Sequence, residues 1–192
     1  MRVMQAFWRT GYSGTSLSDL EEATGVNRRQ LYRVGASKRG LFIDALDSFA
    51  FRAGELHLAH LEAPGAGRAR IVSTLTMLAR PTSNAWGRLG CLLCLTSVDQ
   101  DAMDDTEIAS RVRGYFARIE SAYALALERA FERGELVSDA AEQRATARGL
   151  FGAHVTLVVL ARAGVKEAIL VDIAEQAVLT IGQAPAGGNS AS

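Results

Sequence analysis

The side chains at the start of one short predicted helix, residues 28–34, carry groups that can pair with DNA bases. Arg28, Arg29 and Gln30 occupy its first turn. Arginine donates two parallel hydrogen bonds to guanine O6 and N7, and glutamine pairs in the same way with adenine N6 and N7. A helix whose first turn enters the major groove presents such side chains to base edges. These three residues are therefore the candidate base-contacting residues.

Sequence signals on either side of Gly25 make this helix the second of a pair. Residues 16–19 read Ser-Leu-Ser-Asp, a capping box that predicts a helix over 17–24. Gly25 follows, where the chain must turn with a positive φ that costs glycine least. Residues 27–30 read Asn-Arg-Arg-Gln and repeat the capping pattern, and Leu31 must then face inward. Two short helices joined by a glycine-containing turn are typical of a helix-turn-helix.

Basic residues gather in this part of a chain whose formal net charge is zero. Residues 1–52 hold eight basic and five acidic residues, and residues 27–39 hold five basic residues and no acid. Lys38 and Arg39 stand in the first turn of the next predicted helix, where cations oppose the helix macrodipole. A DNA phosphate bound at that helix start would explain them. The alternative is an ordinary helical hairpin with a basic solvent-facing side.

The chain from residue 7 to residue 42 resembles the N-terminal domain of the tetracycline-repressor (TetR) family. The spacing of the matching positions agrees without a gap from Gly11 to Phe42. The matching positions are Phe7-Trp-Arg-Thr-Gly-Tyr12, Thr15-Ser16, Asp19-Leu20, Gly25-Val26-Asn27, Leu31-Tyr32, Lys38 and Leu41-Phe42.

This resemblance implies an all-α homodimer with a three-helix DNA-binding domain and a larger C-terminal domain for ligand binding and dimerisation. It implies that Arg28, Arg29 and Gln30 read bases. Phosphate contacts position a protein on DNA without specifying sequence. The expected phosphate-contacting residues are Thr15, Ser16, Tyr32, Arg33 and Lys38.

Two departures from the family pattern bear on how tightly this domain binds DNA. The family usually has a core aromatic residue three positions after the tyrosine of the second helix, where this chain has Gly35. Loss of such a ring costs several kcal/mol unless another side chain, here Val34, moves inward. The first helix is also shorter before Gly11 than is usual in the family.

The rest of the chain favours helices throughout, because no run alternates apolar and polar residues as a strand does. The predicted architecture is all-α, with about nine helices. The expected domains are a helix-turn-helix DNA-binding domain at 1–45, a ligand-binding and dimerisation domain at 46–182 and a disordered tail at 183–192. The predicted helices span residues 1–10, 17–24, 28–34, 38–62, 68–80, 88–99, 105–133, 139–163 and 166–181.

The C-terminal two-thirds offers candidate effector and dimer residues. Scarce buried charge favours a small apolar effector. The candidate pocket residues are Met77, Trp86, Met103, Tyr115, Phe116, Ile119 and Tyr123. Helices 143–163 and 167–181 are expected to pack against a second copy as a four-helix bundle. The candidate dimer-interface residues are Leu150, His154, Leu157, Val158, Ile173 and Ala177.

Other chemistries have weaker support. Cys91 and Cys94 form a C-x-x-C pair within predicted helix 88–99, interpreted as buried core thiols, with a redox-sensing pair as the alternative. Zinc bound by this pair together with His57 and His60 is a further alternative, but no metal site is predicted. No catalytic motif is present, and we expect neither an enzyme nor a cofactor. The absence of a membrane span or signal peptide favours the cytoplasm.

These inferences predict a ligand-responsive DNA-binding regulator, most simply a homodimeric repressor of a near-palindromic operator. Helix 38–62 would act as the lever between effector and DNA, and a coupling of about 1–3 kcal/mol would change the affinity 5- to 150-fold. The competing hypothesis is a dimeric small-molecule or thiol-redox sensor whose DNA-binding domain is weakened.

Overall fold

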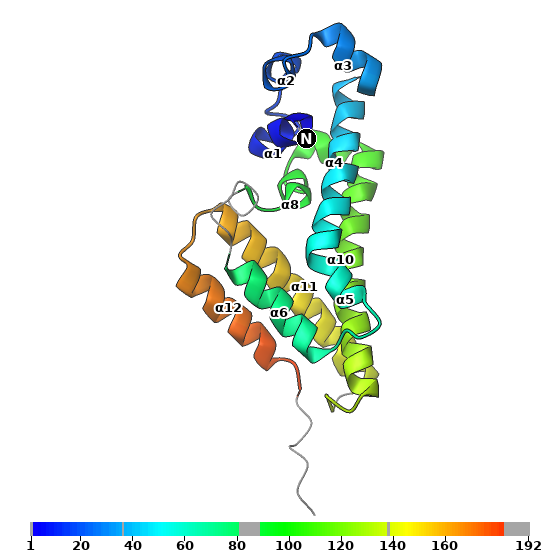
Figure 1. Cartoon of the computed structure of the whole chain (residues 1–192), viewed down its shortest axis with the longest axis vertical. Helices are drawn as coiled ribbons and strands as arrows, with labels where there is room; N and C mark the ends of the chain where they lie inside the picture. Colours follow the sequence, from blue (N-terminus) through cyan, green and yellow to red (C-terminus); the bar gives the residue numbers. More distant parts are fainter. Residues whose placement is uncertain (1, 36, 81–88, 138, 183–192) are drawn as a thin grey trace, which may run out of the picture. The chain divides into compact units, whose positions relative to one another are not determined.

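The structure, a computed structural model, describes residues 2–35, 37–80, 89–137 and 139–182. Every regular element in these ranges is a helix, as Figure 1 shows, so the predicted all-α class is confirmed. None of the described helices is both long enough and apolar enough to span a membrane.

The chain divides into two compact units. We call the first the N-terminal unit, which comprises Met1–Glu55 and Leu89–Phe116. The second is the C-terminal unit, which comprises Leu56–Arg88 and Ala117–Ser192. The candidate DNA-contacting residues therefore lie in the same unit as residues 89–116, which follow them in the sequence by more than fifty residues.

Short, capped helices build the N-terminal unit. They are, in chain order, α1 (Arg2–Thr10), α2 (Leu17–Thr24), α3 (Arg28–Gly35), α4 (Lys38–Ala53), α8 (Leu92–Thr96), α9 (Gln100–Asp104) and the first part of α10 (Thr106–Glu132). Helix α1 packs against α2 and α4, and α8 packs against α1 and α4.

An aromatic cluster forms the core of this unit. The rings of Phe7 and Phe42 meet edge to face with centroids 4.9 Å apart, and Trp8 meets Phe49 in the same way at 4.8 Å. Tyr12 adds a third contact, 4.8 Å from the Phe42 ring. Burying a side chain of this size contributes roughly 1.5–3 kcal/mol. The cluster therefore fixes α1 against α4, the helix that follows α3.

Longer helices build the C-terminal unit. They are the end of a π-helical turn η1 (Gly54–Leu58), α5 (Ala59–Glu62), α6 (Arg68–Ala79), the second part of α10, α11 (Ala140–Arg162) and α12 (Glu167–Leu179). Helices α6, α11 and α12 pack against one another, and Figure 1 shows them side by side. Their buried side chains include Ile71, Leu75, Leu150, Leu157 and Leu170.

Two predicted helices differ from the structure. The helix expected over 38–62 is interrupted by the π turn η1 between α4 and α5. The helix expected over 88–99 is broken at Gly90, which takes a φ of +65°, and α8 then begins at Leu92 and ends at Thr96. Asp99 then caps a separate helix α9, accepting a hydrogen bond from the Ala102 N–H.

Two predictions concern residues outside the described ranges, namely the candidate pocket residue Trp86 and the expected disordered tail at 183–192. The predicted inward movement of the Val34 side chain is also outside what the structure describes, because only the backbone of Val34 is described.

Candidate functional site

The first helix of the predicted pair begins and ends as the sequence indicated. The Asp19 N–H donates to Ser16 Oγ (3.1 Å), and the Ser16 N–H donates to Asp19 Oδ2 (2.7 Å). Hydrogen bonds from the Ser16 backbone N–H and from the Ser16 side chain stabilise the Asp19 carboxylate and lower the pKa of Asp19. Gly25 closes α2 with φ +73° and ψ +13°, a left-handed conformation. The first capping box and the glycine turn are confirmed.

The second helix carries its own reciprocal cap. The Gln30 N–H donates to Asn27 Oδ1 (3.0 Å), and the Asn27 N–H donates to Gln30 Oε1 (3.2 Å). Glu21 on α2 accepts a hydrogen bond from the backbone N–H of Arg28, which ties the two helices together. Leu31 is 3% exposed, so its inward orientation is confirmed.

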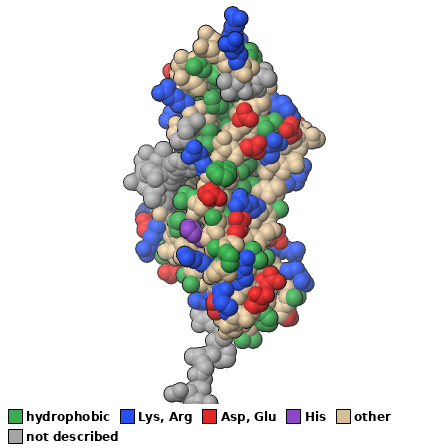
Figure 2. All heavy atoms as spheres, turned by 45° about the vertical axis from the view of Figure 1, so that its right-hand side comes forward, with side chains coloured by type: hydrophobic (Ala, Val, Ile, Leu, Met, Phe, Trp, Pro, Cys, Tyr) green, Lys and Arg blue, Asp and Glu red, His purple; other side chains and the backbone are tan. Residues whose placement is uncertain are grey.

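The candidate base-contacting side chains lie on the open side of α3. Arg28, Arg29 and Gln30 are all exposed, and no described carboxylate forms a salt bridge with either arginine. Lys and Arg side chains project from the upper end in Figure 2, where Figure 1 draws α2 and α3. The side-chain oxygen Oε1 of Gln30 accepts the hydrogen bond of the Asn27 N–H in the cap, which leaves the side-chain NH₂ group of Gln30 as a donor for DNA.

Four candidate phosphate-contacting residues are accessible. Ser16 and Arg33 are exposed, and Tyr32 is 41% exposed. Lys38, at the start of α4, places Nζ 4.5 Å from the centre of the Tyr12 ring. A cation held over an aromatic face gains about 0.5–1 kcal/mol at an exposed site and loses side-chain freedom. Tyr12 therefore positions the Lys38 ammonium beside the helix pair.

Thr15 differs from the other four, because it is only 1% exposed. Its hydroxyl lies 2.6 Å from the Gly11 carbonyl oxygen, to which it donates, and 2.7 Å from Thr10 Oγ1. The buried Thr15 hydroxyl is thus used within the turn between α1 and α2, and Thr15 is not among the residues proposed below to contact phosphates.

Arg39 is held by acids from a distant part of the sequence. Its Nη2 donates to Asp105 Oδ1 (3.1 Å) and to Glu107 Oε2 (2.7 Å), and its Nε donates to the other Asp105 oxygen. These hydrogen bonds lower the pKa of Asp105 to about 2. The sequence hypothesis that both first-turn cations of α4 await a phosphate is therefore revised, since Arg39 already has two carboxylate partners.

A second polar cluster, which the sequence reasoning missed, holds the turn between α1 and α2. The Ser13 N–H donates to Asp99 Oδ2 (2.8 Å), and the Ser13 hydroxyl donates to Asp99 Oδ1 (2.5 Å) and Asp101 Oδ2 (2.8 Å). No local signal could have revealed these partners, which lie more than eighty residues along the chain. These hydrogen bonds anchor the turn between α1 and α2 to the start of α9.

The candidate effector residues divide between the two units. Met103, Tyr115 and Phe116 belong to the N-terminal unit, whereas Met77, Ile119 and Tyr123 belong to the C-terminal unit. Tyr115, Ile119 and Tyr123 are buried, while Met103 and Phe116 are half-buried and Met77 is 37% exposed. Their role in effector binding stays a prediction.

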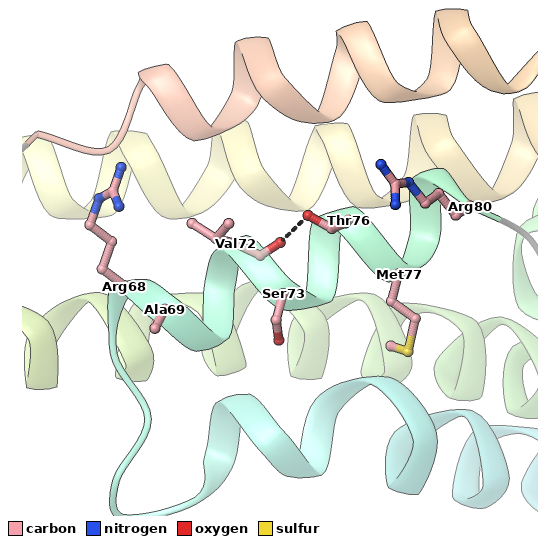
Figure 3. Close-up of a pocket in the computed structure, with 7 residues that line it drawn as sticks. All are labelled: Arg68, Ala69, Val72, Ser73, Thr76, Met77 and Arg80. Carbon is pink, nitrogen blue, oxygen red and sulfur yellow. Dashed lines mark hydrogen bonds between the residues drawn. The ribbon is translucent and has the colours of Figure 1, made fainter.

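A depression of about 650 Å³ lies on the C-terminal unit, and Met77 is the one predicted residue in its lining. All seven lining residues come from α6 and its C-terminal cap, as Figure 3 shows: Arg68, Ala69, Val72, Ser73, Thr76, Met77 and Arg80. Because a single helix supplies the lining, the depression is an open surface feature rather than an enclosed chamber.

A buried polar cluster lies in the core of the C-terminal unit. The Tyr123 hydroxyl is 3.2 Å from His154 Nδ1, and the His57 ring lies edge to face with the His154 ring at 6.2 Å. Burial lowers the pKa of His57 to about 4 and that of His154 to about 3, so both rings are neutral at pH 7. His57 Nδ1 is buried with no hydrogen-bond partner among the described residues, which costs about 1–3 kcal/mol.

The candidate dimer residues lie on α11 and α12 but differ in exposure. Leu150, His154 and Leu157 are buried inside the chain's own core. Val158, Ile173 and Ala177 are half-buried. Larger apolar surface on these helices comes from Val159 (45% exposed), Ile169 (48% exposed) and Leu179 (73% exposed), which the sequence reasoning did not single out. Whether these helices meet a second copy stays a prediction.

The described part of the chain contains few side chains arranged to bind a metal ion. Those residues hold no group of three or more His, Cys, Asp or Glu side chains that could bind a metal ion. Cys91 and Cys94 are both free thiols and both buried.

Comparisons with known proteins agree with this geometry. Residues 4–45 match the family described as bacterial regulatory proteins, tetR family. The HTH-type transcriptional regulator YezE of Bacillus subtilis (strain 168) is 28% identical over 161 residues, covering 84% of this chain and 82% of the relative. The HTH-type transcriptional repressor ComR of Escherichia coli (strain K12) is 43% identical over 60 residues, covering 31% of this chain and 29% of the relative.

Solved structures extend the likeness beyond the helix pair. The TetR family transcriptional regulator CifR, in a cysteine-mutant form complexed with 26-bp double-strand operator DNA, superposes with a TM-score of 0.79 at 26% identity. The match covers 93% of this chain and 92% of CifR. The reduced form of Escherichia coli NemR shares the fold with a TM-score of 0.79 at 18% identity, over 96% of each chain.

Proposed function

We propose that this chain, which belongs to the tetR family of bacterial regulatory proteins, is a repressor that binds operator DNA and responds to a small effector. The family is one of transcriptional regulators rather than enzymes, as the sequence predicted. The observation that carries the proposal is the exposed first turn of α3, where Arg28, Arg29 and Gln30 follow a fully capped turn. CifR, which resembles this chain over most of its length, is complexed with operator DNA.

In this proposal α3 enters the major groove and its first turn reads base edges. Ser16, Tyr32, Arg33 and Lys38 contact phosphates on either side. The Lys38 ammonium is already held beside the helix pair by the Tyr12 ring, so it reaches DNA with less loss of side-chain freedom. Phosphate contacts of this kind position the protein without specifying sequence.

We further propose that the protein acts as a homodimer through α11 and α12. The exposed apolar side chains Val159 and Ile169 lose contact with water if a second copy covers them. Gly149 and Gly152 lie on the exposed side of α11 with no atom within 4 Å of where a Cβ would lie, which allows a partner helix to approach closely. Twofold symmetry then places two recognition helices about 34–36 Å apart on a near-palindromic operator.

The DNA-binding domain is proposed at residues 1–45 and the ligand-binding and dimerisation domain at 46–182. The effector is proposed to be small and mainly apolar, because the buried side chains of the C-terminal unit are mostly uncharged. A coupling of about 1–3 kcal/mol between the two sites is enough to change DNA affinity 5- to 150-fold.

A gel-shift titration tests the proposal with the full chain and DNA that flanks its own gene. We expect saturable binding that survives an excess of unrelated duplex, and binding that Arg29→Ala weakens. The matched control is Arg70→Ala, which removes an exposed arginine from α6 in the C-terminal unit. If folded protein binds no flanking fragment better than unrelated DNA, the repressor function is rejected in favour of a sensor with a weakened DNA-binding domain.

A further inference from the structure

Cys91 and Cys94 stand at the beginning of α8 rather than within a longer helix. Cys91 is the residue that precedes the helix, with extended backbone angles φ −102° and ψ 124°. Its carbonyl oxygen accepts the hydrogen bond of the Leu95 N–H (3.1 Å), and Cys94 is the third residue of the helix. Both side chains therefore point from the same turn of chain, and both are free thiols.

The two thiols form a hydrogen-bonded pair with unequal roles. Burial alone would raise the pKa of the Cys91 thiol, but hydrogen bonds from the Cys94 thiol and from the N–H groups of Cys94 and Leu93 bring this pKa below its ordinary value. The pKa of Cys94 is raised, because its proton is held by the hydrogen bond to Cys91 and because the site is buried. A lowered pKa favours the thiolate form of Cys91, the residue at the N-cap, so Cys91 is assigned as the nucleophile and Cys94, three residues along, as the second thiol.

We propose that Cys91 and Cys94 form a reversible redox site, oxidised to an intramolecular disulfide by a small hydroperoxide. The Cys91 thiolate sulfur attacks the peroxide, the O–O bond breaks, and a sulfenic acid and an alcohol or water are formed. The Cys94 sulfur then attacks the sulfenic sulfur, the S–O bond breaks, and the Cys94 proton leaves with the hydroxyl as water. Two thiols lose two electrons, and the peroxide gains them.

The burial of the pair selects the size of the oxidant. Cys91 is 7% exposed and Cys94 is 8% exposed, which leaves a bulky disulfide such as oxidised glutathione little room to reach either sulfur and favours an oxidant as small as hydrogen peroxide. We therefore expect hydrogen peroxide to oxidise the pair much faster than oxidised glutathione does.

Closing the disulfide joins Cys91, the residue before α8, to Cys94, the third residue of the helix, and the bond requires their Cβ atoms to lie about 3.5–4.5 Å apart. We expect this closure to shift the start of α8 and the residue before it. The deformation acts directly on α1, because the Trp8 indole N–H donates to the carbonyl oxygen of Gly90 (3.1 Å), the residue before Cys91. Helix α8 also packs against α4.

The oxidised protein is thus expected to bind its operator more weakly, and this consequence rests on the proposed DNA-binding function. The oxidation itself does not depend on that function. The two parts can therefore be tested separately.

The oxidation is tested on the full chain carrying Trp86→Phe, which leaves Trp8 as its one tryptophan. After treatment with hydrogen peroxide we expect the loss of two hydrogen atoms in the intact mass, loss of both maleimide-reactive thiols after denaturation, and a shift in Trp8 emission. Dithiothreitol should reverse all three. Thiols that stay reduced in excess peroxide, or a disulfide that joins two chains, would overturn the proposal.

Single variants test the assigned roles. In Cys94→Ser the Cys91 sulfenic acid has no thiol beside it, so dimedone should label Cys91. The matched control, Cys91→Ser, should not be labelled. Circular dichroism establishes that each variant is folded, and the mass measurement on the wild-type pair stands without either variant. Labelling of Cys94 in preference to Cys91 would contradict the roles.

A gel-shift series on the flanking DNA separates the regulatory consequence from the proposed function. We expect at least a fivefold loss of affinity on oxidation, reversed by dithiothreitol and absent from Cys91→Ser. Equal affinity of both forms would overturn the regulation, whereas a reduced protein that binds no DNA would reject the repressor function and leave the redox site to stand on its mass and labelling results.

Discussion

Arg39 Nη2 donates a hydrogen bond of 2.7 Å to Glu107 Oε2, joining the first turn of α4 to the first turn of α10. The same guanidinium holds Asp105, which precedes α10 and also accepts from the N–H groups of Glu107 and Ile108. Arg111 continues the cluster by bonding Asp47 on α4 (2.9 Å). All of these residues lie in the N-terminal unit, so the cluster ties the first turn of α10 to α4 within that unit.

The Arg39 cluster predicts that the stability difference between the wild type and a variant lacking the Asp105 carboxylate depends on pH. The hydrogen bonds from Arg39 lower the pKa of Asp105 from its ordinary 3.8 to about 2, so the contribution of Asp105 to stability is complete above pH 3.8 and is lost as the pH falls toward 2. Asp105→Asn should therefore be less stable than the wild type at pH 6, with a smaller difference at pH 3. Urea unfolding at both pH values measures this. A difference that does not change with pH would contradict the assigned ion pair.

Base reading and phosphate binding should separate by mutation. Arg29→Ala should relax base preference at one position, at a cost of about 1–3 kcal/mol on the preferred operator. Lys38→Ala should weaken binding to all sequences alike and reduce the slope of log affinity against log salt by about one. Fluorescence anisotropy over a salt series, with operator variants, distinguishes the two. Equal effects of both variants on specificity would contradict the roles.

The cap of α2 should contribute measurably to stability. Ser16→Ala removes the oxygen that accepts the Asp19 N–H, and loss of such a cap costs about 1 kcal/mol. Ser18→Ala is the matched control, because Ser18 is exposed on the same helix. Chemical unfolding should show a lower midpoint for Ser16→Ala alone. Identical midpoints for the two variants would show that the cap contributes nothing.

The buried histidines predict that stability falls below neutral pH. Burial lowers the pKa of His154 to about 3 and of His57 to about 4, so between these values and 6.5 the unfolded chain binds protons that the folded chain does not. The free energy of unfolding is therefore unaffected by these histidines above pH 6.5. It declines as the pH falls below 6.5, by up to about 1.4 kcal/mol per pH unit for each histidine. The exposed third histidine supplies the control: His60→Gln should leave the decline unchanged.

The hydrogen bond between Tyr123 and His154 gives a separate prediction. Tyr123→Phe keeps the ring but leaves His154 Nδ1 buried without its hydrogen-bond partner, which costs about 1–3 kcal/mol. Urea unfolding at pH 7 measures the loss. Tyr32→Phe, which changes an exposed tyrosine of α3, should show no comparable loss.

The sequence alone determined the local features of the helix pair. Both capping boxes, the left-handed Gly25 and the inward Leu31 depend on residues within a few positions of one another, so their spacing was sufficient to predict them. The all-α class followed from composition and periodicity in the same way. The family resemblance rests on these same local positions.

Only the tertiary structure decided which side chains are free. Arg39 finds its carboxylate partners 66 and 68 residues away, and Ser13 finds Asp99 across 86 residues. Thr15 could contact a phosphate by its residue type, but its buried hydroxyl donates to the Gly11 carbonyl oxygen instead. The helix expected over 88–99 was too long, because the positive φ of Gly90 and the Asp99 cap outweigh an apolar periodicity that continues past both. Local preference forms the capped helices, whereas packing and charge between distant segments select the groups left to meet DNA.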